Sequence, residues 1–134
     1  MCNELDPRLL DTIRAALPDA MAIYLFGSFA QQRQTQHSDM DFAVLGADKY
    51  PATKIWDLGQ KLAVITGRDV DLVDLRAADT VLRIQVIGKG QCLYQTDQPA
   101  VTVFADFVFS DYARLNEERQ GILEDIAKRG SVYG

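Results

Sequence analysis

The sequence predicts a small α+β domain that carries a long C-terminal helix. Three observations predict this class: short apolar segments typical of strands, amphipathic segments at helical spacing between them, and a helical pattern of about thirty residues after Pro99. A chain of 134 residues can build one domain with a real core, but not a catalytic domain plus a separate acceptor-binding domain. We therefore expect a single domain, 1–134, with a core at about 20–95 and a C-terminal helix at about 98–129.

In the first half of the chain, apolar runs and capping residues indicate helices and two strands. Asp6 is a favourable helix N-cap and Pro7 a favourable first helical residue, so a helix should begin there. A Gly-Ser turn follows the first strand, and Ser28 would cap a short helix. The expected elements are a helix at 7–17, a strand at 20–26, a short helix after Ser28, a polar loop at 34–38 and a strand at 39–45.

The second half of the chain alternates helices and strands. Pro51 begins a helix, and Gly67 is placed to end it. Gly130 likewise stands where the last helix should end. The expected elements are a helix from Pro51 to Thr66, a strand at 69–75, a helix at 78–88, a turn at 88–90, a strand at 91–95 and a last helix from Pro99 to about Lys128.

The last helix carries two apolar groups. The first should pack on the core, and consists of Val101, Phe104, Val108, Tyr112 and Leu115, widened by Phe107 and Phe109. The second is Ile122, Leu123 and Ile126. A helix of about 30 residues spans roughly 45 Å, so its distal half either projects and contacts a partner through the second group or folds back onto its own domain.

Composition and charge exclude several classes of protein. Hydrophobic residues make up 48% of the chain and charged residues 25%, as in folded globular proteins rather than disordered ones. The 14 basic and 19 acidic residues disfavour binding to extended nucleic acid, which needs an excess of cations. Cys2 and Cys92 do not form a disulfide or zinc pattern, and the N-terminus lacks an apolar segment. We expect a cytoplasmic protein without a membrane anchor.

A turn at Gly27-Ser28 is suited to binding phosphate. It follows a buried strand and precedes a helix, so free backbone N–H groups at the helix start converge on one point. The turn therefore predicts a nucleotide phosphate site.

Aspartates follow the turn at strand spacing. Residues two apart on a strand point to the same face, so Asp39 and Asp41 should lie side by side. If their strand neighbours the strand at 69–75, Asp71 completes a cluster, whereas Asp69 sits too near the strand's start. Two carboxylates about 4 Å apart repel by roughly 4 kcal/mol at an effective dielectric near 20. Mg²⁺ removes that cost, and two ions are expected with a triphosphate bound.

Ordinary structural roles compete with this interpretation. A Gly-Ser pair is a common turn, and a lone Asp-x-Asp often marks a solvated strand end. His37, the single histidine, is interpreted as a solvated loop residue, with contact to a phosphate or acceptor as the alternative. The joint spacing of turn and aspartates favours the nucleotide site over these roles.

The motif resembles a known family. Gly27-Ser28-Phe29-Ala30, His37-Ser38-Asp39-Met40-Asp41-Phe42 and Val70-Asp71-Leu72-Val73-Asp74-Leu75 are similar to the signature of the DNA polymerase beta-like nucleotidyltransferases, specifically the minimal nucleotidyltransferase (MNT) proteins. The resemblance covers roughly residues 20–95 and implies a mixed sheet flanked by helices, Mg²⁺, ATP, and transfer of a nucleoside monophosphate to a hydroxyl. The resemblance also implies that Asp39, Asp41 and Asp71 are the catalytic metal ligands.

The resemblance also implies a partner. MNT proteins usually pair with a HEPN toxin, typically a ribonuclease, and act as antitoxins that adenylylate a toxin tyrosine. This chain has Gln31-Gln32 where the family often has Arg-Gly, so Arg33 is the candidate cation for the triphosphate. The alternatives are an antitoxin that blocks the toxin by binding alone and a nucleotidyltransferase for a small molecule.

Overall fold

The structure, a computed structural model, describes residues 6–27, 39–96 and 98–133, with side chains as far as Gly121. The helices are α1 (Pro7–Ala16), α2 (Ala52–Thr66), α3 (Thr80–Lys89) and α4 (Pro99–Tyr133), and the strands are β1 (Ala22–Phe26), β2 (Met40–Leu45), β3 (Val70–Asp74) and β4 (Gln91–Gln95). Each was predicted from the sequence, and all ends but one agree within two residues. The short helix after Ser28 and the loop at 34–38 lie outside the described residues.

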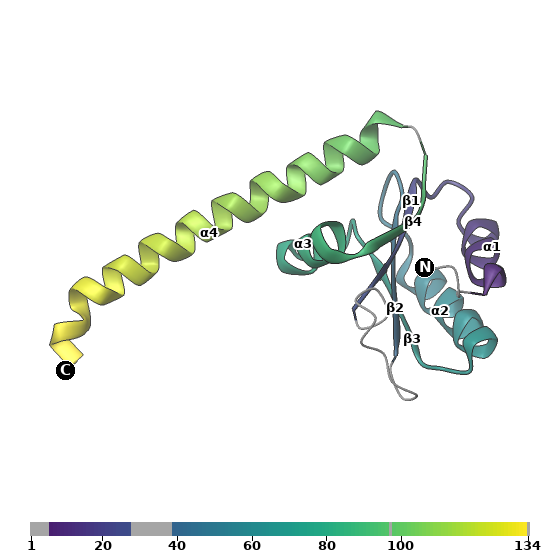
Figure 1. Ribbon diagram of the computed structural model, residues 1–134, viewed down its shortest axis with the longest axis horizontal. Coiled ribbons are helices and arrows are strands. Elements are labelled where there is room, and N and C mark those ends of the chain that lie inside the picture. The colour runs from purple at the N-terminus through teal and green to yellow at the C-terminus, as the bar shows by residue number, and fades with distance from the viewer. Residues whose placement is uncertain (1–5, 28–38, 97, 134) are drawn as a thin grey trace.

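The four strands form one mixed sheet in the order β3-β2-β1-β4. β1 lies antiparallel to both β2 and β4, whereas β2 and β3 run parallel and are connected through α2. Helices α1 and α2 cover one face of the sheet, and α3 lies on the other (Figure 1). The predicted mixed sheet flanked by helices is confirmed.

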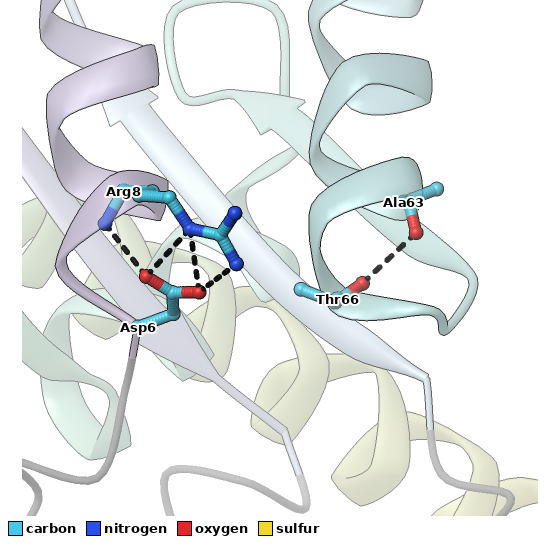
Figure 2. Close-up of polar contacts among 4 residues, drawn as sticks. All are labelled: Asp6, Arg8, Ala63 and Thr66. Atoms are coloured by element: carbon cyan, nitrogen blue, oxygen red, sulfur yellow. Dashed lines mark hydrogen bonds and ion pairs between the residues drawn. The ribbon is translucent and has the colours of Figure 1, made fainter.

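Local capping explains where two helices begin and end (Figure 2). The Asp6 carboxylate accepts a hydrogen bond from the Arg8 backbone N–H at 3.0 Å, which caps α1 as expected. At the end of α2, the Thr66 hydroxyl donates to the Ala63 carbonyl at 3.3 Å. Gly67 then adopts a left-handed φ of 68°, the conformation that ends many helices and that glycine adopts without strain.

Alternation along the strands divides the core between the two faces of the sheet. Ile23, Phe42 and Leu72 belong to the core beneath α1 and α2. Tyr24 and Ala43, which alternate with them, belong to the core beneath α3 and α4. Among the side chains of α4 that the structure describes, those that join this second core lie at its beginning: Val101, Phe104 and Val108.

Helix α4 corrects two expectations. It continues to Tyr133 rather than ending near Lys128, because one glycine at Gly130 costs only about 1 kcal/mol within a helix. Its body extends away from the sheet, which decides between the projecting and folded-back alternatives (Figure 1). Phe107 and Phe109 were expected in the core but are 54% and 49% exposed, because they flank Val108, whose buried side chain faces the core at this point of α4.

A smaller correction concerns the end of α3. A turn was expected from Gly88, but α3 continues to Lys89 and is capped by Gly90, whose N–H donates to the Val86 carbonyl at 2.9 Å. Within the described ranges, none of the helices combines the length and apolarity that crossing a bilayer demands.

Candidate active site

The predicted aspartates lie at one end of the sheet. Asp41 is the second residue of β2 and Asp71 the second residue of β3, and the two are register partners across the parallel pair. Asp39 directly precedes β2. Their sequence neighbours Phe42 and Leu72 pack into the core beneath α1 and α2. The three carboxylates therefore project from the opposite face, the one shared with α3 and α4.

Gly27 closes this end of the sheet from the side of β1. It has a φ of 74° and follows Phe26, the register partner of Asp41. A Cβ at Gly27 would collide with a carboxylate oxygen of Asp41. Sequence reasoning assigned Gly27 to phosphate binding alone, whereas the structure adds that its missing side chain leaves room for the Asp41 carboxylate.

The Asp41 carboxyl is electrostatically strained. Its pKa is raised to about 6, mainly by partial burial and then by the negative charges of Asp71 and Asp39. Asp39 and Asp71 are exposed at the rim of the site. Burial and the two neighbouring charges therefore disfavour the charged form of Asp41.

The oxygen donors of this cluster suit a hard divalent cation. Carboxylate oxygens are the ligands that Mg²⁺ prefers, and a cation would offset both the burial and the like charges that raise the pKa of Asp41. Across the part of the chain that the structure describes, no three acidic, histidine or cysteine side chains already converge closely enough to hold a metal ion. The aspartates share a face and an end of the sheet, and their assignment as metal ligands stays a prediction.

The remaining predicted positions cannot be placed. Ser28, Gln31-Gln32, Arg33 and His37 lie outside the described residues. The same holds for the side chains of Ile122, Leu123 and Ile126, the predicted partner contact on α4.

Comparison with known proteins assigns the fold, and the end of the sheet that carries the aspartates, to a family. The sequence matches the family described as Polymerase beta, Nucleotidyltransferase over residues 10–99, which include Gly27 and all three aspartates. The chain belongs to this nucleotidyltransferase family. The resemblance found in the motif is thereby confirmed.

Relatives within the nucleotidyltransferase family match nearly the whole chain. The protein adenylyltransferase MntA of Shewanella oneidensis is 44% identical over 119 residues, which cover 89% of this chain and 85% of MntA. A toxin-antitoxin crystal structure with AMP-PNP contains a chain that is 43% identical, with a TM-score of 0.81 over 92% of this chain and 99% of that one. A tri-AMPylated Shewanella oneidensis HEPN toxin in complex with MNT antitoxin gives 41% identity and a TM-score of 0.73, covering 90% of this chain and 93% of the other.

Proposed function

We propose that the protein is an antitoxin that transfers AMP from ATP to a tyrosine hydroxyl of a cognate HEPN toxin. The observation that carries the proposal is the in-register pairing of Asp41 with Asp71 beside the turn at Gly27. The 44% identity to a protein adenylyltransferase supports AMP as the transferred group. The solved complex of a relative with an AMPylated HEPN toxin supports the acceptor.

Each part of the site has a role in this reaction. Asp39, Asp41 and Asp71 would hold Mg²⁺, which supplies the positive charge that the triphosphate and the attacking oxygen need. The turn that begins at Gly27 would bind phosphate oxygens through its backbone N–H groups, assisted by Ser28 and Arg33. Since ATP and a ribonuclease target both occur in the cytoplasm, we place the reaction there.

The transfer is a single displacement at phosphorus. The tyrosine oxygen attacks the α-phosphorus of ATP and forms a new phosphorus–oxygen bond, while the bond to the β-phosphate oxygen breaks and pyrophosphate leaves. The tyrosine proton passes to the carboxylate of Asp71, which is exposed and therefore reachable by a protein acceptor. Asp41 is half-buried, which restricts the motion of its carboxylate and would keep that carboxylate in place beside the phosphates.

Intact-protein mass spectrometry tests the proposal. The partner to test is a cognate HEPN toxin, sought in the adjoining reading frame as a small helical protein with an Arg-x4–6-His motif. It is incubated with the wild-type chain, ATP and Mg²⁺. We expect the partner to gain the mass of at least one AMP, and Asp39→Asn, Asp41→Asn and Asp71→Asn to abolish the gain. Asp69→Asn is the matched control, because Asp69 lies two residues before Asp71 and outside β3.

Two outcomes would contradict the assignment. If the wild-type protein adds no nucleotide while still silencing the partner, the protein acts by binding alone. If Asp71→Asn transfers AMP as fast as Asp69→Asn, Asp71 is not the third member of the site.

A further inference from the structure

A pocket of about 380 Å³ lies between the end of β3, α3 and the beginning of α4. It is lined by two arginines and four apolar residues: Arg76, Arg83, Ala100, Val103, Phe104 and Phe107. Since Arg76 follows β3 and Asp71 lies near its start, the pocket is at the opposite end of the sheet from the aspartates. From Asp71 the strand continues for three residues to Asp74, or roughly 10 Å, and Arg76 lies in the turn that follows.

Both arginines are held in place by neutral groups. The Arg76 Nε donates to the Gly46 carbonyl at 2.9 Å, and the Arg83 Nε donates to the Leu75 carbonyl at 2.8 Å. Both guanidinium groups also stack on the Phe104 ring, at 4.9 and 5.3 Å from its centroid. The pocket therefore presents two oriented positive charges over an aromatic floor.

Nearby carboxylates are engaged elsewhere. The Asp111 oxygens accept hydrogen bonds from the Thr80 hydroxyl and from Arg114, which lower the pKa of Asp111, and the charge of Arg83 adds only the last contribution to that shift. Asp74 accepts from the backbone N–H groups of Tyr50 and Arg76. Among the described residues, the pocket lining itself contains no acid.

The rim of the pocket is apolar and exposed. Val103 is 65% exposed and Phe107 54% exposed, and they lie one turn apart on α4. Ala100 continues the same line toward the start of the helix. Exposed apolar side chains around a charged centre are typical of a protein-binding surface, in which apolar contacts surround a desolvated ion pair.

We propose that this surface docks a segment of the HEPN toxin that presents an acidic side chain between apolar ones. Charge complementarity requires the acid, and the exposed Val103 and Phe107 require its apolar neighbours. A strand of RNA is a poorer occupant, because the lining is mostly apolar and the chain has a net charge of −5. The proposal rests on the proposed function and adds a surface that holds the toxin while its tyrosine reaches the aspartates.

Matched substitutions on two helices test the docking surface. Val103→Asp places a carboxylate beside Arg76 and Arg83, whereas Val64→Asp makes the same change at an 84% exposed position on α2. Affinity for the HEPN toxin is measured by calorimetry without ATP, and the thermal midpoint of each variant checks its fold. We expect Val103→Asp and Arg83→Gln to weaken binding on the order of tenfold or more, and Val64→Asp to leave it unchanged.

The contribution of the arginine charges to toxin binding can be recognised by its dependence on salt. Added salt should weaken binding of the wild-type protein more than binding of folded Arg83→Gln. Equal affinity of Val103→Asp and Val64→Asp would overturn the proposal, as would a labelled single-stranded RNA that binds the wild type and is lost in Val103→Asp. Transfer of AMP is scored separately: binding that depends on Val103 without transfer refutes the proposed function alone, and transfer without that dependence refutes the docking surface alone.

Discussion

The two ends of one sheet face carry opposite charges. Asp39, Asp41 and Asp71 lie at the start of β2 and β3, and Arg76 and Arg83 lie beyond the end of β3. At the carboxylate end, partial burial and then like charges raise the pKa of Asp41. At the arginine end, guanidinium groups donate to backbone carbonyls and stack on an aromatic ring. We propose that the first end receives cations and phosphate and that the second receives an acid.

The two ends also differ in how they are built. The carboxylate end arises from strand alternation and from the register of two neighbouring strands. The arginine end depends on the packing of α3 and α4 against the last residues of β3. Chemistry at the first end and partner binding at the second should therefore be separable by substitution.

The largest expected effect is that substitutions at the two ends change different properties, catalysis at one end and binding at the other. Asp41→Asn should lower the rate of AMP transfer on the order of 100-fold or more, because the proposed metal site would lose its central ligand and a charge. Affinity for the HEPN toxin should stay within about twofold, because the docking surface is untouched. Arg83→Gln should show the reverse pattern, with weak binding and a normal rate at saturating toxin. Steady-state kinetics with calorimetry measure both quantities, and parallel losses in both variants would show that the ends act as one site.

A pair of glycines sharpens the account of the carboxylate end. Gly27 and Gly67 both have left-handed backbone conformations, with φ of 74° and 68°. Alanine at either position costs roughly 1–2 kcal/mol in backbone strain. At Gly27 it also meets the Asp41 carboxylate, whereas nothing lies within 4 Å of a Cβ at Gly67.

Gly27→Ala should therefore lose at least about tenfold in AMP transfer, since a displacement near 1 Å in an active site has large effects. Gly67→Ala should lose stability alone. Thermal unfolding and transfer rates are measured on both variants. Equal activity in the two would mean that the space beside Asp41 has no role in catalysis.

Much of the carboxylate end could be predicted from the sequence, because a strand places alternate residues on opposite faces. Once Val70 and Leu72 are assigned to the core, Asp71 must share the other face with Asp41. The neighbouring position of β3 and its register depend on contacts distant in the sequence, and only the structure supplies them. The room that Gly27 leaves for Asp41 is likewise a contact across strands.

The arginine end could not be predicted in the same way. Arg76 lies in a connection and Arg83 on a helix, and they meet because Arg83 donates to the backbone carbonyls of Leu75 and Arg76 while α4 packs beside both. One signal was available: Val103 and Phe107 fall outside the helical stripe of Val101, Phe104 and Val108. Apolar residues off the stripe of a helix indicate a second contact surface, which helical spacing alone does not distinguish from a broad core face.

Asp74 links the arginine end to the rest of the sheet. The residue is 7% exposed, and its carboxylate accepts from the backbone N–H of Tyr50 at 2.7 Å and of Arg76 at 3.0 Å. Asp74→Ala should cost about 2 kcal/mol of unfolding free energy, because two donors lose their partner. Chemical denaturation measures this cost. Binding of the HEPN toxin should weaken as Arg76 loses its position, and an unchanged affinity would show that Arg76 does not need this anchor.

The smallest expected effect concerns the contact between α3 and α4 behind the pocket. Asp111 on α4 accepts from the Thr80 hydroxyl and from Arg114, and these bonds lower the pKa of Asp111 below its ordinary value of 3.8. A carboxylate with a lowered pKa in the folded state adds stability that is present above its unfolded pKa. That stability is lost as the pH falls through the lower folded value.

Asp111→Asn should therefore be slightly less stable than the wild type at neutral pH, and the difference should shrink in acid as the wild-type carboxyl is protonated. The effect is small because solvent screens an exposed ion pair. Thermal midpoints of both proteins, measured from pH 7 to about pH 2, follow the convergence. If the difference between the two thermal midpoints stays constant through the acid range, Asp111 contributes through packing rather than through its charge. The α3–α4 contact would then be as insensitive to pH as the apolar rim of the pocket.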